Sequence, residues 1–237
     1  MRINITIPVF NEEKILNKNI RKLLLFCQSN IQSNFKIIIV NNGSTDNTKN
    51  VAEKICKDNK KIEYLFTKEK GRGNAIKTSW LEKDADIYSY MDADLSTNLK
   101  EFPKMISEIK KGYDIVIGSR LLKNSKVGRC IHRTILSKSY NFLVQKFLHT
   151  KIKDLQCGLK VVNKKVVKNL LKKTKDDKWF FDTELLLLAE KGEYKIKEFP
   201  VEWIGNSNTK VKITKTIIDY VINSIKLRWR IKNESKY

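Results

Sequence analysis

Short runs rich in β-branched and aromatic residues alternate with helix-like stretches through the first half of the chain. The strand-like runs cover residues 3–9, 35–40, 62–66, 87–91 and 114–118, and the helix-like stretches cover residues 12–29, 45–58, 74–83 and 99–111. Strands that alternate with helices form parallel sheets with right-handed crossovers. The alternation therefore predicts an α/β fold with a Rossmann-like, mostly parallel sheet flanked by helices.

The length of the chain and the absence of a Pro/Gly-rich linker favour a single domain. The chain has 237 residues, which suits one α/β domain, and its 3 prolines and 9 glycines form no linker. In parallel sheets of this kind, ligands bind at the carboxyl ends of the strands, where the loops gather. The residues that directly follow each predicted strand are therefore the first candidates for a functional site.

Cysteine, histidine and glycine usage excludes several protein classes. The 4 cysteines form no C-x-x-C pair and there are only 2 histidines, which argues against a disulfide scaffold and against a Cys/His zinc site. No G-x-G-x-x-G follows the first strand, so a dinucleotide-binding oxidoreductase loses its main support. The first strand begins at once and no apolar run reaches the ~18–20 residues of a membrane span, so we expect neither a signal peptide nor a transmembrane helix.

Positive charge is the unusual feature of the composition. The chain has 48 Lys+Arg against 26 Asp+Glu, a net charge of +22, yet residues 1–99 hold only 16 of the basic and 12 of the acidic residues. The later part is therefore suited to an anionic partner, which could be a membrane, a substrate phosphate or nucleic acid. The alternative explanation of the positive charge is a composition rich in lysine throughout the chain, without an anionic partner. Because no nucleic-acid-binding motif is present, we expect no nucleic acid partner.

Two carboxylates follow the fourth predicted strand. Asp92 and Asp94 stand two residues apart in M-D-A-D-L-S, where they would repel each other unless a cation neutralises them. Carboxylate oxygens suit Mg²⁺ or Mn²⁺, and Mg²⁺ is often held by one or two carboxylates together with substrate phosphates. We interpret this pair as a metal site, with a solvated acidic turn as the alternative.

Other polar turns follow the first three strands. P-V-F-N-E occupies residues 8–12, N-N-G-S-T-D occupies residues 41–46, and G-R-G occupies residues 71–73. The second segment can be explained as a turn that caps the next helix. The third lacks another glycine in register and is only a weak signal for phosphate binding.

Taken in order, these segments resemble the GT-A fold, family 2 glycosyltransferases. The shared segments are P-V-F-N-E, N-N-G-S-T-D, K-G-R-G-N-A (70–75), D-A-D-L-S (92–96) and G-S-R (118–120). D-L-Q-C-G-L-K (154–160) and W-F-F-D-T-E (179–184) make the chain similar to the dolichyl-phosphate glucose synthase branch of the polyprenyl-phosphate glycosyltransferases. The resemblance spans about residues 3–230.

The resemblance implies roles for particular residues. The donor nucleotide would be bound by Pro8, Phe10, Glu12, Asn42, Lys70 and Gly71, and Asp92 and Asp94 would hold Mg²⁺ or Mn²⁺ on its diphosphate. The acceptor phosphate would be approached by Arg120, Arg129 and Arg133. The sugar side of the site would be closed by Asp154, Gln156, Trp179, Asp182 and Glu184.

The implied reaction is an inverting transfer of a hexose from a nucleotide sugar, UDP-glucose or a related UDP-sugar, onto dolichyl or polyprenyl phosphate. The family usually has aspartates where this chain has Asn41 and Asn42, which leaves GDP-mannose open as the donor. A phosphate monoester has a second pKa near ~6 and needs no base at neutral pH. A glycan hydroxyl, the other possible acceptor, would need a carboxylate base, and Asp154, Asp182 and Glu184 are candidates.

The C-terminal segment reads as a basic amphipathic helix. Its apolar residues Ile217, Ile218, Val221, Ile222, Ile225 and Trp229 recur at helical spacing among Lys215, Lys226, Arg228, Arg230 and Lys232. Such a helix can lie on an anionic membrane, although packing on the sheet would explain the same spacing. We expect a peripheral protein on the cytoplasmic side of a membrane, with a nucleotide-sugar half (1–120), an acceptor half (121–210) and this helix (211–237).

Overall fold

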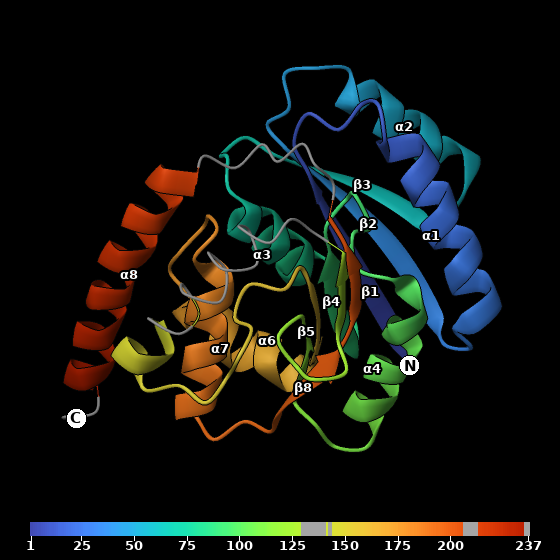
Figure 1. Ribbon diagram of the computed structural model, residues 1–237. Helices are drawn as coiled ribbons and strands as arrows, with labels where there is room; N and C mark the ends of the chain where they lie inside the picture. Colours follow the sequence, from blue (N-terminus) through green and yellow to red (C-terminus); the bar gives the residue numbers. More distant parts are fainter. Residues whose placement is uncertain (129–140, 142–143, 206–212, 235–237) are drawn as a thin grey trace.

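A seven-stranded, mostly parallel sheet forms the centre of the molecule (Figure 1). The computed structural model describes residues 1–128, 141, 144–205 and 213–234. The strand order is β3-β2-β1-β4-β7-β5-β8, in which β7 is antiparallel to both of its neighbours and the other pairs are parallel. A separate parallel pair joins β6 to β9. The predicted α/β fold is confirmed.

The elements have the following bounds. The strands are β1 (Arg2–Val9), β2 (Asn34–Asn42), β3 (Ile62–Thr67), β4 (Ile87–Met91), β5 (Ile115–Ser119), β6 (Lys126–Gly128), β7 (Leu159–Asn163), β8 (Ile196–Pro200) and β9 (Glu202–Ile204). The α-helices are α1 (Leu16–Asn30), α2 (Thr48–Asp58), α3 (Arg72–Glu82), α4 (Phe102–Lys110), α6 (Lys164–Leu170), α7 (Phe181–Lys191) and α8 (Ile213–Glu234). The part of the chain that the structure describes also has two 3₁₀ turns, η1 (Leu99–Glu101) and η2 (Leu171–Lys173).

Helices cover both faces of the sheet. On one face α1, α2 and α4 contribute Leu23, Ala52 and Phe102, among others, to a core with β1 and β2. On the other face α3, α6 and α7 pack against β4, β5 and β7, with Trp80 and Leu186 buried between them. Helix α8 lies outside α7 at the edge of the molecule, as Figure 1 shows.

The five strands predicted from sequence correspond to β1–β5, and their ends differ by at most two residues. Helix α1 begins at Leu16 and not at residue 12, because residues 12–15 form a turn in which Ile15 and Leu16 donate to the Glu12 carbonyl at 3.1 and 3.0 Å. Strands β6, β7, β8 and β9 were not predicted. They pair with partners far away in sequence, and β7 is too short to show a clear period.

The antiparallel direction of β7 brings a distant segment to the site. Met91, the last residue of β4, pairs with Leu159, the first residue of β7. The loop before β7, residues 154–158, therefore reaches the same edge of the sheet as the Asp92 turn. From the other side, Asn98 donates its N–H to the Glu202 carbonyl at 2.8 Å and ties the residues after that turn to β9.

Candidate active site

Residues assigned to the donor nucleotide lie at the carboxyl ends of β1, β2 and β3. The Asn42 side chain, at the end of β2, accepts a hydrogen bond from the Gly71 N–H at 2.7 Å. Lys70 places its Nζ 5.0 Å from the centre of the Phe10 ring, which is 37% exposed. Phe10, Asn42, Lys70 and Gly71 thus form one partly open wall of a candidate donor site.

The remaining two donor residues flank this wall. Pro8 lies beside Val40 in the pairing of β1 with β2. Glu12 is in the turn after β1, where its N–H donates to the Thr48 hydroxyl at 2.8 Å. Asn11, with a left-handed φ of 55°, accepts from the Thr45 N–H at 2.8 Å and so braces the two turns against each other.

The glycines of K-G-R-G-N-A are explained by close packing. A Cβ on Gly71 would lie 2.0 Å from the Asp177 carbonyl oxygen, and a Cβ on Gly73 would lie 2.6 Å from the Phe181 Cβ. The N–H groups of Gly73 and Asn74 donate to the carbonyls of residues 178 and 177 at 3.1 and 2.8 Å. These N–H groups at the start of α3 therefore hold the 176–178 loop and are not free to cradle a phosphate.

Asp92 and Asp94 occupy the turn that follows β4. Asp94 closes this turn by accepting from the Ser96 N–H at 3.0 Å and from the Ser96 hydroxyl at 2.5 Å. Leu95, between Asp94 and Ser96, adopts a left-handed φ of 49°, which is uncommon for a residue other than glycine. The turn is thus held in a specific shape in which Asp94 is fixed by its own backbone.

The Asp92 carboxylate lies between an arginine and a glycine. Its Oδ1 accepts from Nε and Nη2 of Arg72 at 3.1 and 3.0 Å. A Cβ on Gly158 would lie 1.8 Å from Oδ2, so only glycine leaves room for this carboxylate. Arg72 already supplies positive charge to Asp92, and repulsion between the two aspartates is therefore not sufficient evidence for a metal ion.

The chemistry of the pair nevertheless suits a divalent cation. Two carboxylates on one turn are the protein ligands that Mg²⁺ commonly takes, with phosphates and water completing the shell. Among the residues that the structure describes, no three His, Cys, Asp or Glu side chains gather as a metal site. A cation at this turn would therefore take its other oxygens from a bound diphosphate and from water, in addition to Asp92 and Asp94.

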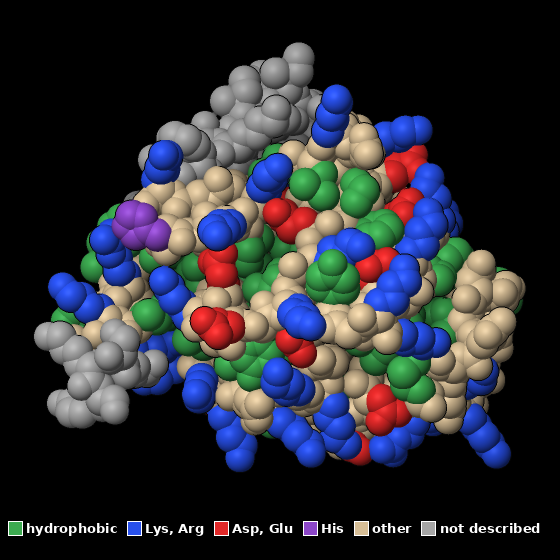
Figure 2. Space-filling view, turned by 90° about the horizontal axis from the view of Figure 1, so that it is seen from below, with side chains coloured by type: hydrophobic (Ala, Val, Ile, Leu, Met, Phe, Trp, Pro, Cys, Tyr) green, Lys and Arg blue, Asp and Glu red, His purple; other side chains and the backbone are tan. Residues whose placement is uncertain are grey.

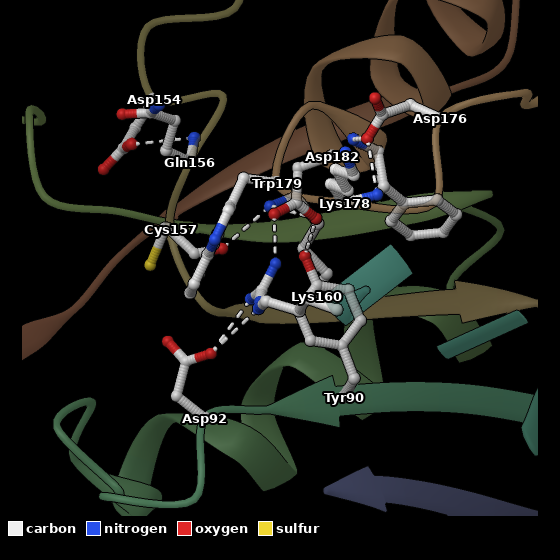
Figure 3. Close-up of polar contacts among 12 residues, drawn as sticks. Tyr90, Asp92, Asp154, Gln156, Cys157, Lys160, Asp176, Lys178, Trp179 and Asp182 are labelled. Carbon is white, nitrogen blue, oxygen red and sulfur yellow. Dashed lines mark hydrogen bonds and ion pairs between the residues drawn. The ribbon is translucent and has the colours of Figure 1, made fainter. Parts of the chain in front are cut away.

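Asp182 is the centre of a buried polar network (Figure 3). Its carboxylate accepts from Arg72 Nη1 at 2.5 Å and from the Tyr90 hydroxyl, and the Lys160 Nζ lies 3.3 Å away. Burial alone would raise the pKa of Asp182, but the charges of Arg72 and Lys160 hold that pKa below its ordinary value. Asp182 is thus a stable carboxylate and a weak base.

Arg120 and Asp154 form a second buried ion pair. Arg120 donates to the Asp154 carboxylate from Nε and Nη2, both at 2.8 Å, and from its backbone N–H at 2.9 Å. The Asp154 side chain has 0% exposure and that of Arg120 has 10%. Burial opposes ionisation of Asp154, but the Arg120 charge keeps the pKa of Asp154 below its usual range. Gln156 lies on the same loop and donates its N–H to Asp154 at 3.2 Å.

The remaining residues assigned to the acceptor side separate in space. Glu184 is 3% exposed and pairs with Arg230 of α8, so it faces α8 and not the Asp92 turn. Trp179 is 45% exposed, with its ring 5.4 Å from the Arg72 guanidinium carbon. Arg129 and Arg133 lie outside the residues that the structure describes.

Sequence reasoning missed three residues of this network: Arg72, Tyr90 and Lys160. Arg72 was passed over as the middle letter of G-R-G, and Tyr90 as part of an apolar strand. Lys160 gave the clearest signal, because a lysine within the apolar run C-G-L-K-V-V is expected to be buried and paired. Its side chain is 0% exposed.

Comparison with known proteins supports the resemblance seen in the motifs. The family model described as Glycosyl transferase family 2 matches residues 4–171. Glycosyltransferase AglD of Haloferax volcanii is 26% identical over 98% of this chain, which spans only 38% of that protein. The dolichyl-phosphate beta-glucosyltransferase ALG5D of Trichomonas vaginalis is 32% identical over 91% of this chain and 69% of its own length. The Saccharomyces cerevisiae dolichyl-phosphate beta-glucosyltransferase is 28% identical over 95% of this chain and 71% of its own length.

Solved structures support the fold. A crystal structure of glucosyl-3-phosphoglycerate synthase from Mycobacterium tuberculosis, in complex with Mn²⁺, UDP and phosphoglyceric acid, superposes with a TM-score of 0.72. The match covers 95% of this chain and 78% of that one at 15% sequence identity. Identity this low establishes a shared fold and leaves the chemistry to the residues of this chain.

Proposed function

The chain belongs to glycosyl transferase family 2, and we propose on that basis that it moves a hexose from a UDP-sugar onto dolichyl or polyprenyl phosphate. UDP-glucose is the donor we favour. The relatives named dolichyl-phosphate beta-glucosyltransferase support this choice, since several of them align with most of this chain. Direct attack by the acceptor phosphate on an α-linked donor would invert the anomeric centre and give a β-linked product.

The donor would bind along the wall formed by Phe10, Asn42, Lys70 and Gly71, with its diphosphate at the Asp92 turn. Asp92 and Asp94 would hold Mg²⁺ or Mn²⁺ there, and the bound cation would neutralise the charge that grows on the departing diphosphate. The structural neighbour crystallised with Mn²⁺ and UDP supports a divalent cation in this fold. The chain's own contribution is to fix both carboxylates on one braced turn.

The state of the carboxylates is the observation that carries the choice of acceptor. Asp154 is paired with Arg120, Asp182 with Arg72 and Lys160, and Glu184 with Arg230. The cationic partners hold the pKa of Asp154 and of Asp182 below the usual range, which makes both poor proton acceptors, and Glu184 faces α8. None of the three therefore suits a general base for a hydroxyl acceptor. A phosphate acceptor is already ionised near neutral pH and needs only to be positioned.

Arg120 is the described arginine that the resemblance assigns to that positioning. Its pair with Asp154 uses Nε and Nη2, so Nη1 lies outside the pair. A guanidinium fixed by a carboxylate can present its remaining N–H groups to a phosphate at little entropic cost. Arg129 and Arg133 remain proposals for the same role.

The experiment that tests the proposal is a matrix of donors and acceptors. UDP-glucose, other UDP-sugars and GDP-mannose would each be offered with dolichyl phosphate, a shorter polyprenyl phosphate and a glycan with free hydroxyls. We expect transfer from UDP-glucose to the two lipid phosphates. Transfer only to the glycan hydroxyl would contradict the proposed acceptor, and transfer only from GDP-mannose would contradict the proposed donor.

Nucleotide binding gives a simpler prediction. UDP should bind more tightly than GDP in the presence of Mn²⁺, by about tenfold or more, because the proposed donor is UDP-glucose; this expectation rests on the similarity to dolichyl-phosphate beta-glucosyltransferases. Isothermal titration calorimetry with both nucleotides would measure the ratio. Tighter binding of GDP would redirect the assignment towards a mannose donor.

We also propose that α8 attaches the enzyme peripherally to an anionic membrane, on its cytoplasmic side. Val221, Ile222 and Ile225 are 53%, 44% and 53% exposed, and Trp229 is 71% exposed. Tyr220 and Leu227, on the opposite side of the helix, are buried in the core. The alternative that this stripe packs on the sheet therefore does not hold for these four side chains, which supports contact with a lipid surface.

The charges around this stripe are not all available to a membrane. Lys226, Arg228 and Lys232 are exposed, although Arg228 also donates from Nη1 to the Phe147 carbonyl at 2.9 Å. Arg230 is 17% exposed and is paired with Glu184. Arg230 was counted with the surface charges from sequence, and its role is instead to attach α8 to α7. Elsewhere Lys and Arg side chains spread over the whole face seen in Figure 2, with Asp and Glu between them, so total charge does not by itself mark a docking face.

Within the described residues, the structure has no helix that is both long and apolar enough to cross a bilayer.

Neutralising the exposed charges of α8 should weaken membrane binding. Each basic residue near an anionic leaflet contributes about 1 kcal/mol. The triple change Lys226→Gln, Arg228→Gln and Lys232→Gln should therefore lower binding to phosphatidylserine vesicles by about 100-fold at low salt, and by less as salt screens the charges. Co-sedimentation across a salt series would measure this.

A matched control removes the same charge elsewhere. Lys18, Lys22 and Lys54 are exposed on α1 and α2, on the side of the molecule away from α8 in Figure 1. Their change to Gln should leave vesicle binding nearly unchanged. Equal losses in both triples would show that total charge, and not α8, drives attachment.

A further inference from the structure

Arg72 occupies an unusual place between two carboxylates. Its side chain is 8% exposed, with Nε and Nη2 directed at Asp92 and Nη1 at Asp182. The rings of Tyr90 and Trp179 lie 4.7 and 5.4 Å from its guanidinium carbon. The side chain is thus fixed from several directions, and one end of it rests on a residue assigned to the cation.

The two carboxylates that share Arg72 differ in their other partners. Asp182 also receives the Tyr90 hydroxyl and has the Lys160 ammonium at 3.3 Å, so it keeps positive charge nearby without Arg72. Asp92 directs Oδ2 at Gly158 and gives Oδ1 to Arg72. The arginine is therefore anchored by Asp182 and covers Oδ1, one of the two oxygens that Asp92 can offer a metal ion.

We propose that Arg72 is a built-in competitor of the divalent cation for Asp92, and that Asp182 sets the strength of this competition. This inference rests on the cation site of the proposed function, and it does not depend on the sugar or on the acceptor. A divalent cation binds a carboxylate oxygen at about 2.1 Å, and a guanidinium in contact with the same carboxylate would repel it. The bare enzyme would bind cations weakly for this reason, and a donor diphosphate would supply the negative charge that shifts the balance.

The test is Mn²⁺ binding without nucleotide, measured by electron paramagnetic resonance of the free ion. Arg72→Gln should bind Mn²⁺ at least about tenfold more tightly than the wild type, because a positive charge in contact with the ligand carboxylate is removed. This variant is expected to fold, since Asp182 keeps Lys160 and Tyr90. Asp182→Asn should bind Mn²⁺ more weakly, because Arg72 then has Asp92 as its remaining carboxylate.

Two comparisons separate this mechanism from general charge effects. Lys77→Gln removes a positive charge from the same helix at a side chain paired with Asp177, and it should leave Mn²⁺ affinity nearly unchanged. In the Arg72→Gln background, Asp182→Asn should have a much smaller effect than it has alone, because Asp182 acts through Arg72. If Arg72→Gln alone does not fold, the double variant can be compared with Asp182→Asn. The double variant should then bind Mn²⁺ more tightly than Asp182→Asn does.

The outcomes are distinct. Unchanged or weaker Mn²⁺ binding in Arg72→Gln, or an equal gain in Lys77→Gln, would overturn the competition while the proposed function stands. Full additivity of the two changes would overturn the role of Asp182. Wild-type enzyme that binds no Mn²⁺ even with saturating UDP would overturn the cation site itself, and the inference with it.

Discussion

Replacing Asp92 by asparagine should lower the rate of sugar transfer by about 1,000-fold or more. The change removes the charged oxygens that we expect to hold the cation on the donor diphosphate. The fold should survive, because Arg72 keeps its pair with Asp182 and Gly158 leaves room for an asparagine of the same shape. A transfer assay with Mn²⁺, with circular dichroism to verify folding, measures both effects.

Asp94 and an unrelated aspartate complete this experiment. Asp94→Asn should give a similar loss of transfer, since an asparagine oxygen can still accept from the Ser96 N–H and keep the turn closed. Asp58→Asn, at the exposed end of α2, is the control and should retain full activity. Full transfer in the presence of EDTA, or in both Asp92→Asn and Asp94→Asn, would refute the cation site.

The first half of the fold could be predicted from the sequence, because each of its strands is marked by a pattern of neighbouring residues. Each of β1 to β5 is a compact apolar run, and the turns that follow them contain the polar residues that form the site. The second half depends on pairing across long separations. Strand β7 enters the sheet between β4 and β5 in the opposite direction, and no local pattern in residues 159–163 indicates which neighbours it will take.

The sequence predicted which residues form the site, but it did not predict the hydrogen bonds and ion pairs that connect them. The motifs selected Asp92, Asp154 and Asp182, but they could not show which cation each one faces. Glu184 stands two residues from Asp182 in the same motif, yet two positions along a helix rotate a side chain by about 200°, which is enough to direct it towards α8. Pairing between buried charges depends on the directions of the side chains in the folded structure. The spacing of residues along the sequence does not determine those directions.

The pair of Arg120 with Asp154 allows structural and functional contributions to be separated. Arg120→Met should lower the free energy of unfolding by about 3–5 kcal/mol, because Asp154, with 0% side-chain exposure, would keep a buried charge without its arginine. It should also abolish transfer to a short, detergent-dispersed polyprenyl phosphate. Urea denaturation and the transfer assay would measure the two effects.

The double variant Arg120→Met with Asp154→Leu distinguishes the two roles. Removing both charges relieves the unpaired carboxylate, so most of the lost stability should return, as it does when a buried pair is replaced by apolar side chains. Transfer should not return, because no guanidinium is left to position the acceptor phosphate. Arg120→Lys should restore stability in part and transfer only weakly, since an ammonium lacks the planar fork that meets Asp154 with two nitrogens. A double variant that recovers both stability and transfer would show that Arg120 serves only to neutralise Asp154, and the acceptor phosphate would then have to be held by other cations.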